Sequence, residues 1–519
     1  MSIIRSAAKV GGFTSISRVL GFVRDILVGY TLGTGAVAEA FFIAQRFPNL
    51  FRTLFAEGAF NSAFVPLFSR KLQAEGEDAA HLFAREVFAV MLVWITLFTG
   101  FAIAAMPWLI YVIAPGFKGS AEKIALATSL TQVCFPYLLF MTLTALQGGV
   151  LNSMHKFSAA AAAPILLNVV MILSNAVAWF LNTGNTPMTG YIFALGITIS
   201  GVAQYALLAM ACRNAGMPLI PMWPRLTPGV KKVIAKAIPG IISGGAMQIN
   251  LVLGTIIASN IGGAVAYLYY ADRLYQLPLG IIGVAIGVVL LPSLSKSLRA
   301  GDDAGALATS NRAIEFSLFL TLPAAAALMV IAGPILQTMF EHGEFKSADT
   351  RAVAPALIAY AAGLPAYSLT KVFQPGFYAR EDTRTPMIFA LVSVLVNVSL
   401  SFILSYFIGH VGIALAATVA AWTNAAQLYF RLRALGHFAV DRSLRIKLPL
   451  MLLSTAVMAM ALFDLNLYLG SNFAASAGRF SGIWSLALLI GVGGISYFAA
   501  SQLSGAWRIS ELKAALKRK

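Results

Sequence analysis

The chain has 519 residues, of which 59% are hydrophobic and only 11% are charged. A soluble domain carries about 25% charged residues, so this composition excludes an ordinary water-soluble protein and predicts an α-helical membrane protein. The net charge of +17 does not indicate a nucleic-acid-binding protein. The bases lie mostly between apolar runs, where they set membrane topology and attract anionic phospholipid headgroups.

Fourteen apolar runs are long enough to span a bilayer, which takes about 20 mostly apolar residues. They lie near residues 7–33, 37–69, 83–113, 124–150, 158–182, 188–213, 231–259, 265–295, 311–340, 350–379, 385–407, 411–434, 445–468 and 482–504. No cleavable signal peptide is evident, so the first run is expected to remain as a helix.

The bases outside these runs or near their ends are distributed unevenly between the two sides. Twenty-six fall in the termini and in alternate connecting segments, and five fall in the remaining segments. Because cytoplasmic loops carry the excess of Lys and Arg, this distribution predicts a multi-pass protein of the bacterial inner membrane with both termini in the cytoplasm.

Two stretches of sequence recur at a nearly constant offset. The segment Gly35–Ala38 recurs as Gly263–Ala266, 228 positions later, and Pro66–Leu72 resembles Pro292–Leu298, 226 positions later. Three single-residue matches have offsets of 227 to 229: Pro107 with Pro334, Gly149 with Gly376, and Asn168 with Asn397. Runs one to six therefore repeat as runs seven to twelve.

The repeat predicts how the fourteen helices are organised. Because six is an even number, both halves enter the membrane from the same side, and an axis along the membrane normal relates them across a cavity. The fold class expected is an all-α membrane protein with 14 transmembrane helices. Residues 1–225 form an N-terminal lobe, residues 226–440 a C-terminal lobe, and residues 441–519 hold helices 13 and 14 with a basic cytoplasmic tail.

Six bases lie inside the apolar runs and away from their ends: Arg18, Arg24, Arg46, Arg52, Arg273 and Lys371. A base at the centre of a span costs roughly 2.5–3.5 kcal/mol, so these residues are expected to face a wet cavity or to pair with acids. The candidate acids are Asp25, Glu39, Glu57 and Asp272. Seven-residue spacings predict that Arg18 pairs with Asp25 and that Glu39 pairs with Arg46.

The bases outnumber these acids, so the cavity is expected to be positively charged. Arg18, Arg24, Arg52 and Arg273 are the candidate ligand-binding residues, because a guanidinium binds phosphate oxygens bidentately and a diphosphate fits such a cluster. Arg46, Glu57 and Lys371 are interpreted mainly as structural ion pairs.

No catalytic, metal or cofactor site is expected. The acidic pairs Asp302-Asp303 and Glu381-Asp382 are interpreted as solvated turns, and the five histidines are scattered near helix ends. Cys134 and Cys212 lie in apolar runs and form no CxxC pair, so they are interpreted as small core residues.

Several motifs resemble those of the MurJ (MviN) lipid II flippases of the MOP exporter superfamily. They are SRVLGFVRD at 17–25, PNLFR at 48–52, FAEGAF at 55–60, FVP at 64–66, YYADRL at 269–274, LPSLS at 291–295 and PGFY at 375–378. The resemblance covers nearly the whole chain.

This resemblance implies fourteen helices in two lobes around a cationic cavity. It implies that the protein moves lipid II, the undecaprenyl-diphosphate-linked peptidoglycan precursor, from the cytoplasmic to the periplasmic leaflet by alternating access. It also implies a role in cell-wall synthesis and cell shape, with the cell-wall synthesis machinery as a candidate partner. The family's cavity arginines map onto Arg18, Arg24, Arg52 and Arg273, and its acid early in helix two maps onto Glu39. Helices 13 and 14 form a groove for the lipid tail in the family.

One departure concerns sodium. Some family members bind sodium through acids in helices seven and eleven, but 231–259 and 385–407 contain no Asp or Glu. Since hard cations take oxygen ligands, usually including carboxylate, such sodium coupling is not expected here.

Three alternatives remain open. A flippase for another polyprenyl-diphosphate glycan shares the diphosphate chemistry, and only the family motifs argue against it. A multidrug exporter of the same superfamily needs an acidic cavity for cationic drugs. A membrane glycosyl- or phosphotransferase needs a metal or nucleophile site.

Overall fold

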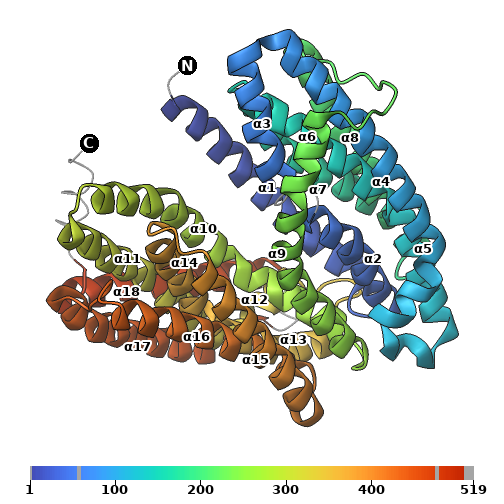
Figure 1. Cartoon of the computed structure of the whole chain (residues 1–519). Helices are drawn as coiled ribbons and strands as arrows, with labels where there is room; N and C mark the ends of the chain where they lie inside the picture. Colours follow the sequence, from blue (N-terminus) through green and yellow to red (C-terminus); the bar gives the residue numbers. More distant parts are fainter. Residues whose placement is uncertain (1–2, 55–59, 474–478, 508–519) are drawn as a thin grey trace. The chain divides into compact units, whose positions relative to one another are not determined.

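The computed structural model describes residues 3–54, 60–473 and 479–507, and the regular elements within these ranges are all helices (Figure 1). The chain divides into two compact units. The first unit comprises Met1–Ala266 and Gly343–Phe345, and the second comprises Tyr267–His342 and Lys346–Lys519.

The first unit holds nine α-helices and one short 3₁₀ helix among its described residues, together with the start of α10. They are α1 (Ile3–Leu32), α2 (Ala36–Arg52), α3 (Phe60–Glu75), α4 (Glu77–Ile113), η2 (Pro115–Gly119), α5 (Ala121–Cys134), α6 (Pro136–Ser153), α7 (Ser158–Phe180), α8 (Pro187–Asn214) and α9 (Pro228–Ser259).

The second unit begins within α10 and contains the remaining elements. They are α10 (Ala264–Arg299), α11 (Asp303–Val330), α12 (Ala332–Met339), α13 (Ser347–Ala361), α14 (Leu364–Tyr378), α15 (Arg384–Ile408), α16 (His410–Ala434), α17 (Arg442–Leu469), η3 (Gly470–Phe473) and α18 (Arg479–Ser504).

Ten spans within the described residues are long and apolar enough to cross a bilayer, with α5–α6 and α13–α14 each counted as one span. The prediction of an all-helical, multi-pass membrane protein is therefore confirmed. The lobe boundaries placed at residues 225 and 440 stay a prediction.

Helix boundaries recur at the spacing of the sequence matches. Ala36 and Ala264 begin α2 and α10, 228 positions apart, and Glu77 and Asp303 begin α4 and α11, 226 positions apart. The breaks within the spans α5–α6 and α13–α14 lie 227 positions apart, because α5 ends at Cys134 and α13 at Ala361.

Helices α1 and α7 run parallel, because two polar contacts between them are separated by seven residues on both helices. The Arg24 Nη1 atom donates to the Asn168 Oδ1 atom at 3.1 Å, and the Thr31 hydroxyl donates to the Asn175 Oδ1 atom at 3.1 Å. Seven residues are about two helical turns, so both contacts lie on one face.

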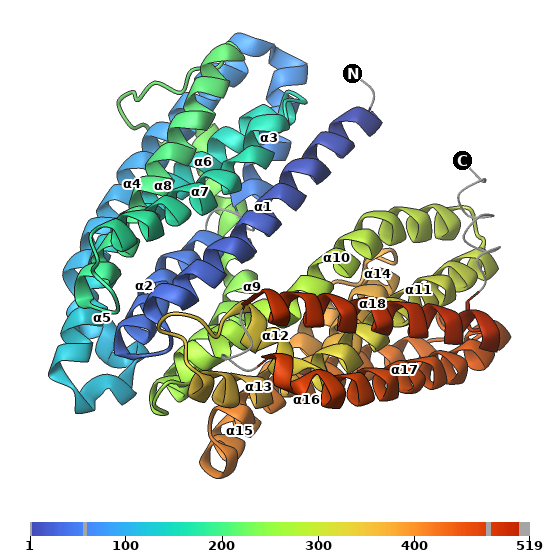
Figure 2. The ribbon, with the colours of Figure 1, turned by 180° about the vertical axis from the view of Figure 1, so that it is seen from behind.

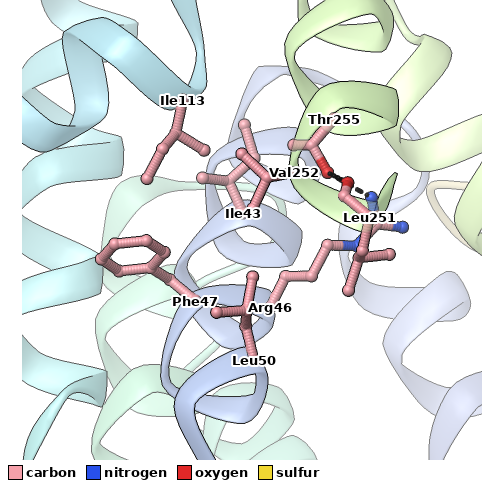
Figure 3. A pocket seen from close by; sticks show the side chains of 8 residues that line it. All are labelled: Ile43, Arg46, Phe47, Leu50, Ile113, Leu251, Val252 and Thr255. Carbon is pink, nitrogen blue, oxygen red and sulfur yellow. Dashed lines mark hydrogen bonds between the residues drawn. The ribbon is translucent and has the colours of Figure 1, made fainter. Parts of the chain in front are cut away.

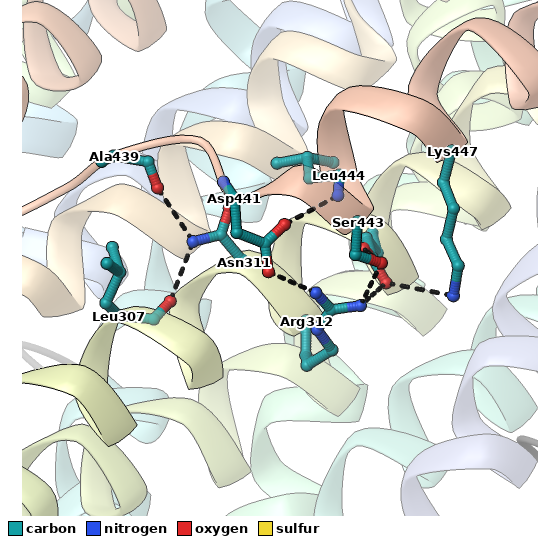
Figure 4. A network of polar contacts seen from close by, with 9 residues as sticks. Leu307, Asn311, Arg312, Ala439, Asp441, Ser443, Leu444 and Lys447 are labelled. Atoms are coloured by element: carbon teal, nitrogen blue, oxygen red, sulfur yellow. Dashed lines mark hydrogen bonds and ion pairs between the residues drawn. The ribbon is translucent and has the colours of Figure 1, made fainter.

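In the second unit, α17 and α18 pack side by side, and α17 also packs on α11 (Figures 1 and 2). A polar network joins α11 to the start of α17 (Figure 4). Glu315, which is 2% exposed, accepts from the Ser443 hydroxyl at 2.8 Å and pairs with Arg312 and, at 3.6 Å, with Lys447. Arg312 also pairs with Asp441, the N-cap residue of α17.

Candidate functional site

The most buried arginine of the predicted set is Arg24, which is 7% exposed. Its Nη2 atom lies 2.8 Å from the Asp25 Oδ1 atom, and its Nε atom donates to the same oxygen at 3.0 Å. Asn168 of α7 accepts from the Arg24 Nη1 atom and uses its own amide to donate to the Ser17 carbonyl at 2.8 Å. The guanidinium is thus oriented from two helices.

The seven-residue spacing predicts an Arg18–Asp25 pair, and this prediction is wrong. Asp25 pairs instead with its sequence neighbour Arg24. The Arg18 side chain lies on an exposed part of α1. Arg18 is therefore a guanidinium accessible to a ligand.

Glu39, the acidic residue in the first turn of α2, is buried, with 3% of its surface exposed. It pairs with Lys123 of α5, and its Oε1 atom accepts from the Val265 backbone N–H at 3.3 Å. The Lys123 Nζ atom also lies 3.8 Å from the centroid of the Phe117 ring. The predicted Glu39–Arg46 pair is therefore wrong, because Lys123 reaches this carboxylate from another helix.

Arg46 extends instead toward α9, where its Nη1 atom donates to the Thr255 hydroxyl at 3.0 Å (Figure 3). The two residues border a cavity of about 10 Å³, lined otherwise by Ile43, Phe47, Leu50, Ile113, Leu251 and Val252. A space of that size holds about one water molecule and is too small for a larger ligand. The hydrogen bond between Arg46 and Thr255 therefore joins α2 to α9.

Arg52 lies at the end of α2 and is partly buried. Its Nε atom donates to the Asn49 Oδ1 atom at 2.7 Å, one helical turn earlier. The contact uses one edge of the guanidinium. Glu57, the acid expected nearby, lies outside the described residues.

In the second unit, Arg273 and Asp272 are neighbours on α10 with different contacts. The Arg273 guanidinium carbon lies 4.7 Å from the centroid of the Tyr269 ring. Asp272 accepts from the Gln276 amide one turn further along. Lys371, on α14, is exposed.

The charged residues of the first unit differ in burial and contacts. Asp25 pairs with Arg24, and Glu39 pairs with Lys123, whereas Arg18 is exposed on α1. A buried ion pair is costly to break by removing one partner, whereas an exposed guanidinium is able to bind an anion. No group of three or more potential metal ligands is present among the described residues.

Two partners in this site have a weak signal in the sequence. Asn168 is one of three asparagines in the apolar run at 158–182, and polar residues in such runs are often functional. Lys123 is one of the five bases in the base-poor set of segments. Its partner becomes evident only from the packing of α5 on α2.

Comparison with known proteins identifies the family. Residues 28–477 match the family described as "Lipid II flippase MurJ". The "Probable lipid II flippase MurJ" of Rhizobium tropici is 45% identical over 525 aligned positions, which cover 100% of this chain and 97% of that protein.

Two solved structures have the same fold. One, "Lipid II flippase MurJ, inward closed conformation", superposes with a TM-score of 0.78 at 26% identity and covers 95% of this chain and 98% of that chain. The other, an inward-facing multidrug resistance MATE family transporter of the MOP superfamily, has a TM-score of 0.68 at 16% identity and covers 81% and 95%. The second likeness concerns the fold alone. The family match, the close relative and the first structure together show that this chain belongs to the MurJ family.

Proposed function

We propose that this chain is a lipid II flippase, which moves the undecaprenyl-diphosphate-linked peptidoglycan precursor from the cytoplasmic to the periplasmic leaflet of the bacterial inner membrane. Family membership across residues 28–477 is the observation that carries this proposal. MurJ is a family of transporters, so the chain is a transporter rather than an enzyme.

The substrate diphosphate binds to Arg18, Arg24, Arg52 and Arg273. Exposure of Arg18 on α1 supports this role, as does the partial burial of Arg52 and Arg273, which lowers the screening of their charge. Guanidinium groups suit diphosphate because each offers two parallel donors to phosphate oxygens.

Arg24 requires an additional step, because its guanidinium already contacts Asp25 and Asn168. It binds the diphosphate by exchanging the Asp25 contact for a phosphate oxygen. The exchange removes the Arg24 contact from the buried Asp25 carboxylate, so substrate binding changes the free energy of this part of α1. In this scheme Asn168 keeps the guanidinium in place in both states.

The chain crosses the membrane fourteen times. Helices α1, α9 and α10 contain 30, 32 and 36 residues, and at 1.5 Å per residue each exceeds the roughly 30 Å hydrocarbon core. These three helices and the pair α2–α3 add four spans to the ten apolar ones. The excess of bases on one side supports cytoplasmic termini.

Transport proceeds by alternating access, in which two six-helix lobes rock about a central cavity. The 226–228-residue recurrence of helix starts supports two related lobes. The excess of bases over acids within the apolar runs favours an anionic lipid over the cationic drugs of a multidrug exporter. The cell-wall synthesis machinery stays a candidate partner.

The test uses the purified chain in proteoliposomes that contain fluorescent lipid II. The proposal predicts time-dependent loss of lipid II from one leaflet, measured by a membrane-impermeant quencher, which protein-free vesicles do not show. A polyprenyl-diphosphate carrying an unrelated glycan serves as the comparison substrate. Movement of that lipid but not of lipid II would establish the alternative glycolipid flippase instead.

A further inference from the structure

The first unit contains a cavity of about 460 Å³ between α4 and α9, which we name the α4–α9 cavity. Its described lining residues are Phe60, Val87, Val90, Met91, Trp94, Thr142, Leu226, Val230, Val233, Ile234, Ala237 and Ile238. None of the arginines assigned to the substrate is among them. Its volume falls in the range of about 300–1,000 Å³ that is usual for small-molecule sites.

Water is a poor occupant of this cavity. Of the twelve described lining residues, Thr142 is the one with a hydroxyl group, and that hydroxyl donates to the Leu138 carbonyl of its own helix at 2.8 Å. A buried water needs two to four polar partners, and apolar cavities stay dry. A hydrocarbon chain supplies the missing contacts, because it matches aliphatic and aromatic walls.

The cavity is closed at one end and open along one side. At the closed end, a Cβ atom on Gly229 would lie 3.0 Å from the Phe83 ring, so the two helices touch there. The Thr227 hydroxyl fastens the same end by donating to Glu86 at 2.9 Å. Further along, the lining residues Trp94 and Ile238 are 46% and 49% exposed, so the cavity reaches the surface beside them.

The closed end carries a cluster of positive charge. Arg225, Lys231 and Lys232 are all exposed and flank the lining residues Leu226 and Val230. The nearby acid Glu86 is engaged by Thr227. Basic clusters beside a membrane-spanning helix attract anionic phospholipid headgroups. The basic cluster therefore suits the headgroup of a lipid whose acyl chain occupies the apolar cavity. The phosphate group of a glycerophospholipid is able to reach these exposed bases.

We propose that the α4–α9 cavity binds one acyl chain of an anionic phospholipid, whose phosphate group lies at Arg225, Lys231 and Lys232. The lipid fills the gap between α4 and α9 and thereby supports their packing. This site is separate from the substrate arginines, and the inference does not depend on the proposed transport of lipid II.

Native mass spectrometry of the delipidated full-length protein tests the proposal. Phosphatidylglycerol is titrated against phosphatidylcholine of the same acyl chains, and one phosphatidylglycerol per protein is expected to bind preferentially. Each base replaced by alanine should lower phosphatidylglycerol affinity about fivefold, since a base near the surface contributes about that much. Phosphatidylcholine binding should change little.

Ala237→Trp fills the cavity and should weaken phosphatidylglycerol binding about tenfold or more. Ala235→Trp is the matched control, because Ala235 is exposed on the same helix and does not line the cavity. Equal affinity for both phospholipids in the unmodified protein, or equal affinity of the two tryptophan variants, would overturn the proposal. Displacement of phosphatidylglycerol by equimolar undecaprenyl diphosphate would also overturn it, because the cavity would then serve a polyprenyl chain.

A second measurement avoids any dependence on the folding of Ala237→Trp. Phosphatidylglycerol with brominated acyl chains is titrated into the protein in detergent, and quenching is compared with that of the Trp94→Phe variant. The difference isolates Trp94, which lines the cavity. Saturable quenching at about one lipid per protein supports the site, and the absence of quenching contradicts it.

Discussion

Replacing Lys123 with methionine tests the buried ion pair at the start of α2. The substitution keeps the length of the side chain but removes the cation that pairs with Glu39. The Glu39 side chain is 3% exposed, and its Oε1 atom would keep the long 3.3 Å hydrogen bond from the Val265 backbone. The variant therefore leaves a buried carboxylate without its counter-ion.

The expected loss in the free energy of unfolding is about 3–5 kcal/mol, the usual cost of removing one partner of a buried ion pair. The double variant Glu39→Gln, Lys123→Met removes both charges and should recover much of that loss. Because the two residues are in contact, their effects should be non-additive by about 0.5–3 kcal/mol.

Equilibrium unfolding in mixed detergent micelles measures these differences. Lys118→Met is the matched control, since Lys118 is exposed and the same substitution there should cost no more than about 0.5 kcal/mol. Equal losses for Lys118→Met and Lys123→Met, or additive effects of the Glu39 and Lys123 substitutions, would refute the reasoning.

Two further predictions concern tightly packed positions in the first unit. Asn168→Leu removes a hydrogen-bond acceptor from the Arg24 cation and should lower the free energy of unfolding by about 1.5–3 kcal/mol. Asn175→Leu, which loses a contact with a neutral hydroxyl on the same helix, should lower it by about 0.5–1.5 kcal/mol. Equal losses would contradict the hydrogen bond between Arg24 and Asn168. Gly343→Ala places a Cβ atom 2.3 Å from the Tyr30 carbonyl oxygen at φ +62°, so thermal unfolding should show a much larger loss than for Gly76→Ala, where φ is +89° and no atom lies within 4 Å. Similar melting temperatures for the two glycine variants would show that this close approach is absent.

The sequence predicts the membrane-spanning character well because that property is local. A run of about 20 apolar residues has one stable solution in a bilayer, a helix whose backbone groups are satisfied internally. The runs at 158–182 and 385–407 accordingly appear as α7 and α15 with boundaries shifted by only a few residues. The family motifs along the chain can likewise be recognised without knowing how the helices pack.

The partners of the buried charges are not local, and the sequence predicts them poorly. Helical spacing places Asp25 on the face of Arg18, yet Asp25 pairs with the adjacent Arg24, whose guanidinium also donates to Asn168 of α7. Glu39 finds its counter-ion 84 positions away, at Lys123. Such choices depend on which helices pack together, and helix periodicity carries no information on that.

Arg273 allows the substrate-binding proposal itself to be tested. It lies about ten residues into α10, and Tyr269 one turn earlier packs beside its guanidinium at 4.7 Å. Lysine at this position keeps the charge but loses the planar fork that binds two phosphate oxygens. Losing one hydrogen bond to a charged group costs about 1.5–3 kcal/mol, so Arg273→Lys should lower transport by roughly 10- to 150-fold. Arg273→Ala, which also removes the charge, should abolish it.

Both variants are expected to insert and fold, because Arg273→Lys keeps the charge and Arg273→Ala removes a positive charge from a cationic cavity, which also removes repulsion. Complementation of a strain depleted of its own flippase measures function, with protein amounts checked by immunoblotting. Arg299→Ala is the control, since Arg299 is the last residue of the same helix and is exposed. It should support growth, because a charge at a helix end lies outside the hydrocarbon core. Full growth on Arg273→Ala at normal protein amounts would show that this arginine does not bind the substrate.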